Sequence, residues 1–173
     1  LDFDRNIDLD EIIKMLSIHE IGETLIGDIT PFDGMTPKQK REIEFKAVQD
    51  LLGNLKDKTR LLDTFSDFES KFSNEARFSF YCDKLEADLQ SKYYQDTNQH
   101  RSLDDQETNK VMNLDLTKRL IAEGAKTPFD IWYAYDEKIY RQFYHFSEFQ
   151  DLLTLIRDNN MLRKPMDPII EKI

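Results

Sequence analysis

Apolar side chains recur at helical spacing along most of the chain, and this pattern constrains the fold more than any other feature of the sequence. Near the start, Leu9, Ile12, Ile13 and Leu16 follow the i, i+3, i+4, i+7 order of a helix with one apolar face. Only 5 glycines and 5 prolines interrupt the 173 residues, and no strand-like alternation persists. The sequence therefore predicts an all-α fold, a bundle of about six to seven helices.

Capping residues mark where the predicted helices begin and end. Asp8 can cap the first helix, which is expected to run to about Ile26 and to stop at Gly27. Gly22 would lie inside this helix, which indicates close packing against a neighbour. The Thr36–Gln39 segment is a capping box with proline at the first helical position.

The later helices are predicted from their apolar faces. The second, third and fourth helices are expected to bury Ile43, Ala47, Val48, Leu51, Leu52 and Leu55; Leu61, Leu62, Phe65, Phe68 and Phe72; and Phe78, Cys82, Leu85 and Leu89. Ser73 or Asn74 could cap the fourth. A loop is expected over Gln95–Glu107, a fifth helix over Asn109–Glu123, and two more opening at Thr127-Pro128 and Ser147.

The length predicts one domain, assigned here to residues 1–158, followed by an irregular tail at 159–173 with Pro165 and Pro168. The formal net charge is -10, and no basic patch is present, which argues against a nucleic-acid partner. No apolar run has the length of a membrane helix.

The single cysteine, Cys82, excludes an internal disulfide and favours a reducing, cytoplasmic location. Cys82 is interpreted as a buried apolar residue rather than a nucleophile.

The segment from His19 to Asp28 is the most informative stretch for chemistry. On a helix, His19, Glu20 and Glu23 would share one flank, and an imidazole beside two carboxylates can bind a divalent cation. By spacing alone, a structural histidine and a solvated acidic face explain these residues more simply. The zinc-protease pattern His-Glu-x-x-His fails because the second histidine is absent.

A second stretch, Phe80–Asp88, places Asp83 and Glu86 three residues apart on one predicted helix face, beside apolar side chains. An acid next to an apolar stripe can be a functional group held close to a core. It can equally be a surface acid paired with Lys84, so this stretch alone is a weak signal.

Together the two stretches resemble the HD-domain metal-dependent phosphohydrolases, in the branch that contains the 5'-deoxynucleotidases. The residues from His19 to Pro31 run His-Glu-Ile-Gly-Glu-Thr-Leu-Ile-Gly-Asp-Ile-Thr-Pro. They are similar to the family run His-Asp-x-x-Glu-x-x-x-Gly-Asp-Ile-x-Pro, and Cys82–Glu86 resembles the later segment that supplies a metal ligand. The resemblance covers about Leu9 to Tyr94 and implies an HD-like helical bundle.

The chain departs from the family pattern at two points. Position 20 is Glu where the family has Asp, and the extra methylene changes how the carboxylate reaches a cation. The family also takes a ligand from a histidine on an earlier helix, but none of the 18 residues before His19 is histidine. The first residue is Leu1 rather than Met, which favours a fragment that lacks the family's N-terminal helix over a degraded metal site.

The resemblance implies a role for each matching residue. His19, Glu20 and Asp83 would hold a divalent metal ion, with Mn, Co, Fe, Ni, Zn and Mg all left open. Glu23 would orient or deprotonate the attacking water, and Asp28 would hold the water or the leaving group. The implied substrate is a small phosphate ester, a nucleoside 5'-monophosphate, and the implied assembly is a homodimer.

Other residues have weaker claims to a role. Phe32 could receive a base, and a cluster of basic side chains could steer phosphate, although a solvated helix start explains that cluster more simply: Lys38, Lys40 and Arg41. Three hypotheses remain, in order of preference: a metal-dependent phosphohydrolase, an HD-fold module that acts by binding, and a plain helical interaction protein.

Overall fold

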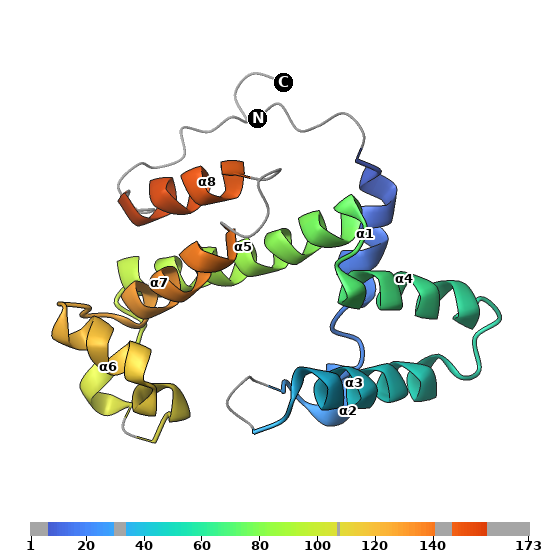
Figure 1. Cartoon of the computed structure of the whole chain (residues 1–173), viewed down its shortest axis with the longest axis horizontal. Coiled ribbons are helices and arrows are strands. Elements are labelled where there is room, and N and C mark those ends of the chain that lie inside the picture. Colours follow the sequence, from blue (N-terminus) through green and yellow to red (C-terminus); the bar gives the residue numbers. More distant parts are fainter. Residues whose placement is uncertain (1–6, 30–33, 107, 141–146, 159–173) are drawn as a thin grey trace. The chain divides into compact units, whose positions relative to one another are not determined.

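The computed structural model describes residues 7–29, 34–106, 108–140 and 147–158. Helices α1 to α8 and two short 3-10 turns follow one another along these residues, which contain no strand (Figure 1). The prediction of an all-α fold is confirmed. The chain divides into two compact units, Leu1–Asp83 and Lys84–Ile173. The assignment of residues 1–158 to a single domain stays a prediction, and the expected tail lies outside the described residues.

The first unit contains α1 (Leu9–Ile18), α2 (Glu23–Ile26), α3 (Pro37–Leu52), α4 (Lys58–Ser70) and the start of α5 (Asn74–Asp96). The prediction of one continuous helix from Leu9 to Ile26 is wrong. Tight bonds between residues three apart replace the helical pattern after Ile18, from Ile21 N to Ile18 O (3.1 Å) and from Glu23 N to Glu20 O (3.0 Å). Gly27 ends α2 with a φ of 74°, as expected of a glycine stop.

Gly22 lies where this turn meets α3. A Cβ built on Gly22 would lie 3.1 Å from Val48 Cγ2 and 3.2 Å from the carbonyl oxygen of Glu44, so the backbone of the turn lies directly against α3. A side chain at this position would force Val48 or the backbone of α3 to shift by a few tenths of an ångström, and glycine avoids this. The predicted close packing of Gly22 is confirmed, and it fixes the start of α2 on α3.

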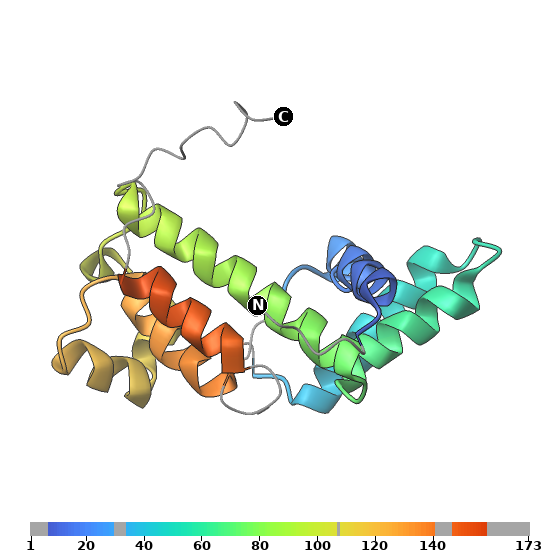
Figure 2. The same cartoon turned by 90° about the horizontal axis from the view of Figure 1, so that it is seen from above.

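Helices α3 and α4 lie side by side in both views and enclose a core of Val48, Leu52 and Phe65 (Figures 1 and 2). The Thr36–Gln39 capping box that opens α3 is confirmed. Several predicted core residues are instead partly or largely exposed, because they lie on the outer faces or beyond the helix ends: Ile43 37%, Leu51 37%, Leu55 51% and Phe72 82%.

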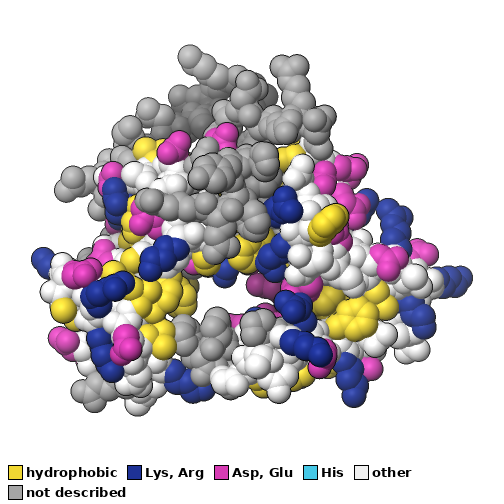
Figure 3. All heavy atoms as spheres, in the orientation of Figure 1, with side chains coloured by type: hydrophobic (Ala, Val, Ile, Leu, Met, Phe, Trp, Pro, Cys, Tyr) yellow, Lys and Arg dark blue, Asp and Glu magenta, His cyan; other side chains and the backbone are white. Residues whose placement is uncertain are grey.

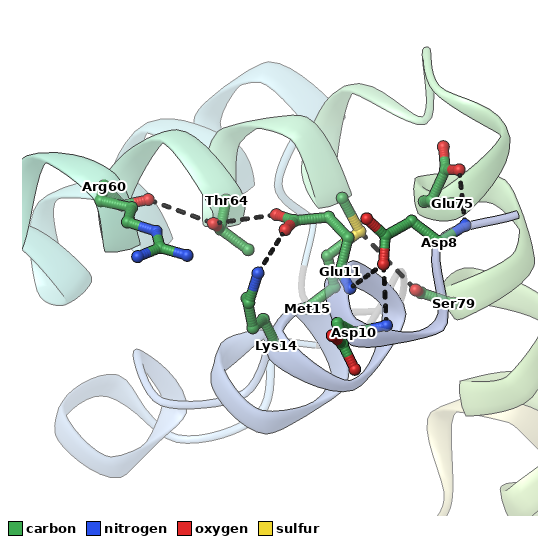
Figure 4. Close-up of polar contacts among 9 residues, drawn as sticks. All are labelled: Asp8, Asp10, Glu11, Lys14, Met15, Arg60, Thr64, Glu75 and Ser79. Carbon is green, nitrogen blue, oxygen red and sulfur yellow. Dashed lines mark hydrogen bonds and ion pairs between the residues drawn. The ribbon is translucent and has the colours of Figure 1, made fainter.

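Polar contacts fix α1 against α5 within the first unit (Figure 4). The side chain of Asp8 caps α1, and the backbone amide of Asp8 donates to the carboxylate of Glu75 at 3.1 Å. One turn further along α5, the buried hydroxyl of Ser79 contacts the sulfur of Met15 at 3.6 Å. Because these contacts run along α1, they orient its C-terminal end, where His19 lies, towards the next turn of α5.

The second unit contains the rest of α5, η1 (Leu103–Asp105), η2 (Lys110–Asn113), α6 (Asp115–Ala122), α7 (Pro128–Tyr140) and α8 (Ser147–Asp158). The predicted helix over Asn109–Glu123 is divided, because Leu114 has an extended backbone with a ψ of 141°. The predicted loop over Gln95–Glu107 begins later than expected and contains η1. Helices α7 and α8 pack together, with Tyr140 and Phe149 stacked at 6.0 Å (Figure 2).

Candidate metal centre

His19, Glu20 and Asp83 converge at the end of α1 in the first unit. His19 Nε2 lies 3.2 Å from Asp83 Oδ1 and 3.7 Å from Glu20 Oε1. One potential ligand atom from each residue lies within 4.8 Å of the others, a grouping that could hold a metal ion. The fold thus brings together the three residues proposed as ligands, although 64 residues of chain separate the histidine from the aspartate.

The ring of His19 is held in one orientation. Its Nδ1–H donates to the carbonyl oxygen of Leu16 at 2.9 Å, and it packs against the ring of Phe68, tilted by 50° with 4.9 Å between centroids. This bond fixes the proton on Nδ1 and points Nε2 at the carboxylates, as metal-binding histidines require. Burial lowers the pKa of His19, but the hydrogen bond and the negative charge of Asp83 outweigh it and raise the pKa above 6.5.

The distances from His19 to the two carboxylates are close to those around a divalent transition metal. Nitrogen and oxygen ligands lie about 2.0 to 2.2 Å from such an ion, so adjacent ligands around it are roughly 3.0 to 3.5 Å apart. The 3.2 Å between His19 and Asp83 meets this requirement as it stands. The 3.7 Å between His19 and Glu20 needs a small shift, which the exposed Glu20 side chain can make. Imidazole with carboxylates suits several divalent metals rather than one.

Glu23 and Asp28, the two proposed catalytic acids, lie at either end of α2. Burial raises the pKa of the half-buried Glu23, and the negative charges of Asp28 and Glu20 raise it further, while Lys40 opposes them. A carboxylate with a raised pKa is a stronger base, as general base catalysis near neutral pH requires. Asp28 follows the stop at Gly27 and is exposed. Glu23 therefore lies within the electrostatic influence of both Asp28 and Glu20.

A family model described as HD domain matches residues 1–123. The chain belongs to the HD domain family. The match spans the whole of the first unit, with all three candidate ligands, and extends into the second. The predicted resemblance and the all-α bundle that it implied are both confirmed.

Curated relatives carry a more specific name. A protein from Dictyostelium discoideum named 5'-deoxynucleotidase is 33% identical over 93 residues, which is 53% of this chain and 49% of the relative. Relatives of the same name from Xenopus laevis and Saccharomyces cerevisiae are 32% and 31% identical, over 54% and 53% of this chain and 47% and 46% of their own lengths. The chain therefore spans about half the length of the curated relatives it matches.

The structure places the other residues singled out in the sequence in different environments. Lys38 is exposed and pairs with Glu42 at 3.8 Å, as a solvated helix start would. Lys40 instead donates to the carbonyl oxygen of Ile29 at 2.7 Å. Cys82 is half-buried, and burial raises its pKa to about 11, which supports its interpretation as a non-nucleophile. Phe32 lies outside the described residues.

Sequence reasoning missed the residues that support the centre. The sequence carries no signal for the Leu16 carbonyl, because it is a backbone group. Phe68 was predicted only as a core residue. Lys40 was interpreted together with its exposed neighbours, since its partner Ile29 is 11 residues away, in the segment that follows α2. On the face shown in Figure 3, basic and acidic side chains are interspersed over the described residues. Among those residues no helix is both long and apolar enough to span a membrane.

Proposed function

We propose that this chain is a metal-dependent phosphomonoesterase that acts on nucleoside 5'-monophosphates, like the 5'-deoxynucleotidases it resembles. The observation that carries the proposal is the grouping of His19, Glu20 and Asp83 within 4.8 Å in a chain of the HD domain family. The names of the relatives supply the substrate class, and the raised pKa of Glu23 supplies a base beside the ligands.

The chain's own residues divide the work of hydrolysis. His19, Glu20 and Asp83 would hold a divalent cation, which when bound supplies positive charge to phosphoryl oxygens and acidifies water. Glu23 accepts a proton from the attacking water at its carboxylate. The water oxygen forms a bond to phosphorus as the bond to the 5'-oxygen breaks, and a proton passes to the departing alcohol. Asp28 orients the water or the leaving group from the opposite end of α2.

The decisive experiment is hydrolysis of a panel of nucleoside 5'-monophosphates with and without Mn, Co and Mg. Phosphate release that requires metal and is lost in Glu23→Ala and in Asp83→Ala would support the proposal. Glu86→Ala is the matched control, because Glu86 is an exposed acid on the same helix as Asp83 and outside the ligand group. A folded chain that releases no phosphate with any metal would contradict it.

A second candidate is an HD-fold module that binds a ligand or a protein without turnover. Glu20 favours it, because this side chain is 67% exposed and is the more distant of the two carboxylates from His19. The two candidates differ in the same assay: a module would bind nucleotide or metal and release no phosphate.

Two further expectations belong with this proposal. The single cysteine supports a cytoplasmic location. Exposed apolar side chains support a homodimer, among them Leu9 at 64% and Ile13 at 61% on α1. Sedimentation of the chain would test the dimer, and Ile13→Asp is expected to shift it towards monomer if this face is buried between copies.

A further inference from the structure

Lys40 connects α3 to the segment that carries the catalytic acids. Its ammonium group donates to the carbonyl oxygen of Ile29 at 2.7 Å, and it lies 3.4 Å from the carboxylate of Glu44 one turn further along α3. The side chain of Glu44 is only 9% exposed, and that of Lys40 is 36% exposed. A partly buried charge pair with a backbone acceptor is a defined contact rather than a solvated surface pair.

The same face of α3 holds both ends of this segment. At one end Gly22 lies against Val48 and the backbone of Glu44. At the other end the buried Ile29 is bonded to Lys40. Glu23 and Asp28 lie between these two attachment points. Asp28 directly precedes the bonded carbonyl of Ile29, so the bond restricts the backbone that carries Asp28.

The charge of Lys40 also faces the acids of this region. It lowers the pKa of Glu23, against the effects of burial, Asp28, Glu20 and Glu44. It likewise lowers the pKa of Glu44, against burial and Glu69, with help from Lys71. Lys40 is therefore placed to compensate negative charge on both sides of the contact between α2 and α3.

We propose that Lys40 is a positioning residue that ties the Gly27–Ile29 segment to α3 and so holds Asp28 near Glu23. This inference rests on the proposed function. Lys40 acts through the backbone of Ile29 and through Glu44, not by touching substrate. A displacement of a catalytic group by about 1 Å can cost on the order of a hundredfold in rate, so a single backbone tether can matter for turnover.

The test compares Lys40→Met with Lys38→Met. Lys38 is the matched control, because it lies on the same helix and makes an i,i+4 pair with Glu42 but has no backbone partner among its described contacts. Lys40→Met is expected to lower kcat on the order of tenfold to a hundredfold with KM within about twofold, as loss of positioning predicts. Lys40→Arg keeps a donor and a charge and is expected to recover part of the loss.

Amide hydrogen exchange supplies a readout that does not need turnover. Lys40→Met is expected to speed exchange at Gly27, Asp28 and Ile29, while Lys38→Met leaves it unchanged. Manganese affinity is expected to stay within about twofold of the parent, because the variant leaves His19, Glu20 and Asp83 in place. Equal exchange at these amides and equal kcat in the two methionine variants would overturn the inference.

The unaltered chain provides a second measurement if Lys40→Met fails to fold. The ammonium protons of Lys40 are expected to exchange with solvent more slowly than those of Lys38, because Lys40 donates to a carbonyl. Equal rates would overturn the tether. A chain without phosphatase activity that still protects these protons would contradict the proposed function and leave the tether standing.

Discussion

The hydroxyl of Tyr140 on α7 donates a hydrogen bond to Asp88 Oδ2 on α5 at 2.8 Å, inside the second unit. Asp88 is 1% exposed, as is Tyr140. Burial raises the pKa of Asp88 from 3.8 to about 7, and the negative charge of the neighbouring Asp136 adds to the rise. Asp88 is therefore a buried acid, and folding favours its neutral form.

This relationship predicts that the stability of the fold declines between about pH 4 and pH 7. In that range the unfolded chain has released the Asp88 proton and the folded chain retains it, so raising the pH favours unfolding. Asp88→Asn removes the titration and keeps an oxygen that can accept from Tyr140. We expect it to flatten the pH dependence and to raise the unfolding free energy at pH 8 by about 2 kcal/mol.

Urea unfolding of the parent chain and of the Asp88→Asn variant at a series of pH values measures this effect. Glu86→Gln serves as the control, because Glu86 is an exposed acid two residues earlier on α5. A parent chain whose stability rises steadily from pH 4 to pH 7, with Asp88→Asn less stable at pH 8, would contradict the account of this pair.

Metal affinity tests the candidate ligands separately from catalysis. His19→Gln and Asp83→Asn are each expected to weaken Mn²⁺ binding at least on the order of tenfold to a hundredfold, because each removes or weakens one of few donors. Glu20→Asp is expected to change the affinity less, since it keeps the carboxylate and shortens its reach. Calorimetric titration of the folded variants checks this, and unchanged binding by Asp83→Asn would exclude it as a ligand.

Gly22→Ala is expected to destabilise the first unit by about 1 kcal/mol or more, because the new Cβ would crowd the side chain of Val48 and the backbone of Glu44. The φ of Gly22 is -63°, so an alanine there carries no backbone strain and the loss would come from the contact alone. Gly53→Ala is the matched control, since its new Cβ would meet only ordinary contacts at 3.4 and 3.5 Å. Thermal unfolding of both variants distinguishes them; equal melting temperatures would contradict the close packing.

Phe68 and Phe72 lie four residues apart and were predicted to share one buried face. The structure buries Phe68 to 5% exposure against His19, and leaves Phe72 82% exposed beyond the end of α4. Phe68→Ala is therefore expected to cost about 3 kcal/mol of stability, and Phe72→Ala less than about 0.5 kcal/mol. Chemical denaturation compares them, and a similar loss in both would show that Phe72 is buried in solution.

Sequence alone determined the helical class, the capping residues and the family. Apolar spacing and capping chemistry are local, so Asp8, the Thr36–Gln39 box and the stop at Gly27 could be predicted from neighbours in the chain. The candidate ligands also came from the sequence, but through their resemblance to a family rather than from spacing. Their residue types alone favoured a solvated surface.

Only the tertiary structure decided where the first helix breaks, which apolar residues are buried, and what supports the metal centre. Gly22 packs against α3 at this break, and the exposure of Phe72 depends on where α4 ends. The Leu16 carbonyl and the carbonyl of Ile29 that accepts from Lys40 leave no periodic signal, because backbone atoms carry no residue identity. The apolar spacing predicted Phe68 as a core residue but not its contact with the ring of His19. Contacts of this kind exist only when segments distant in the chain are packed together.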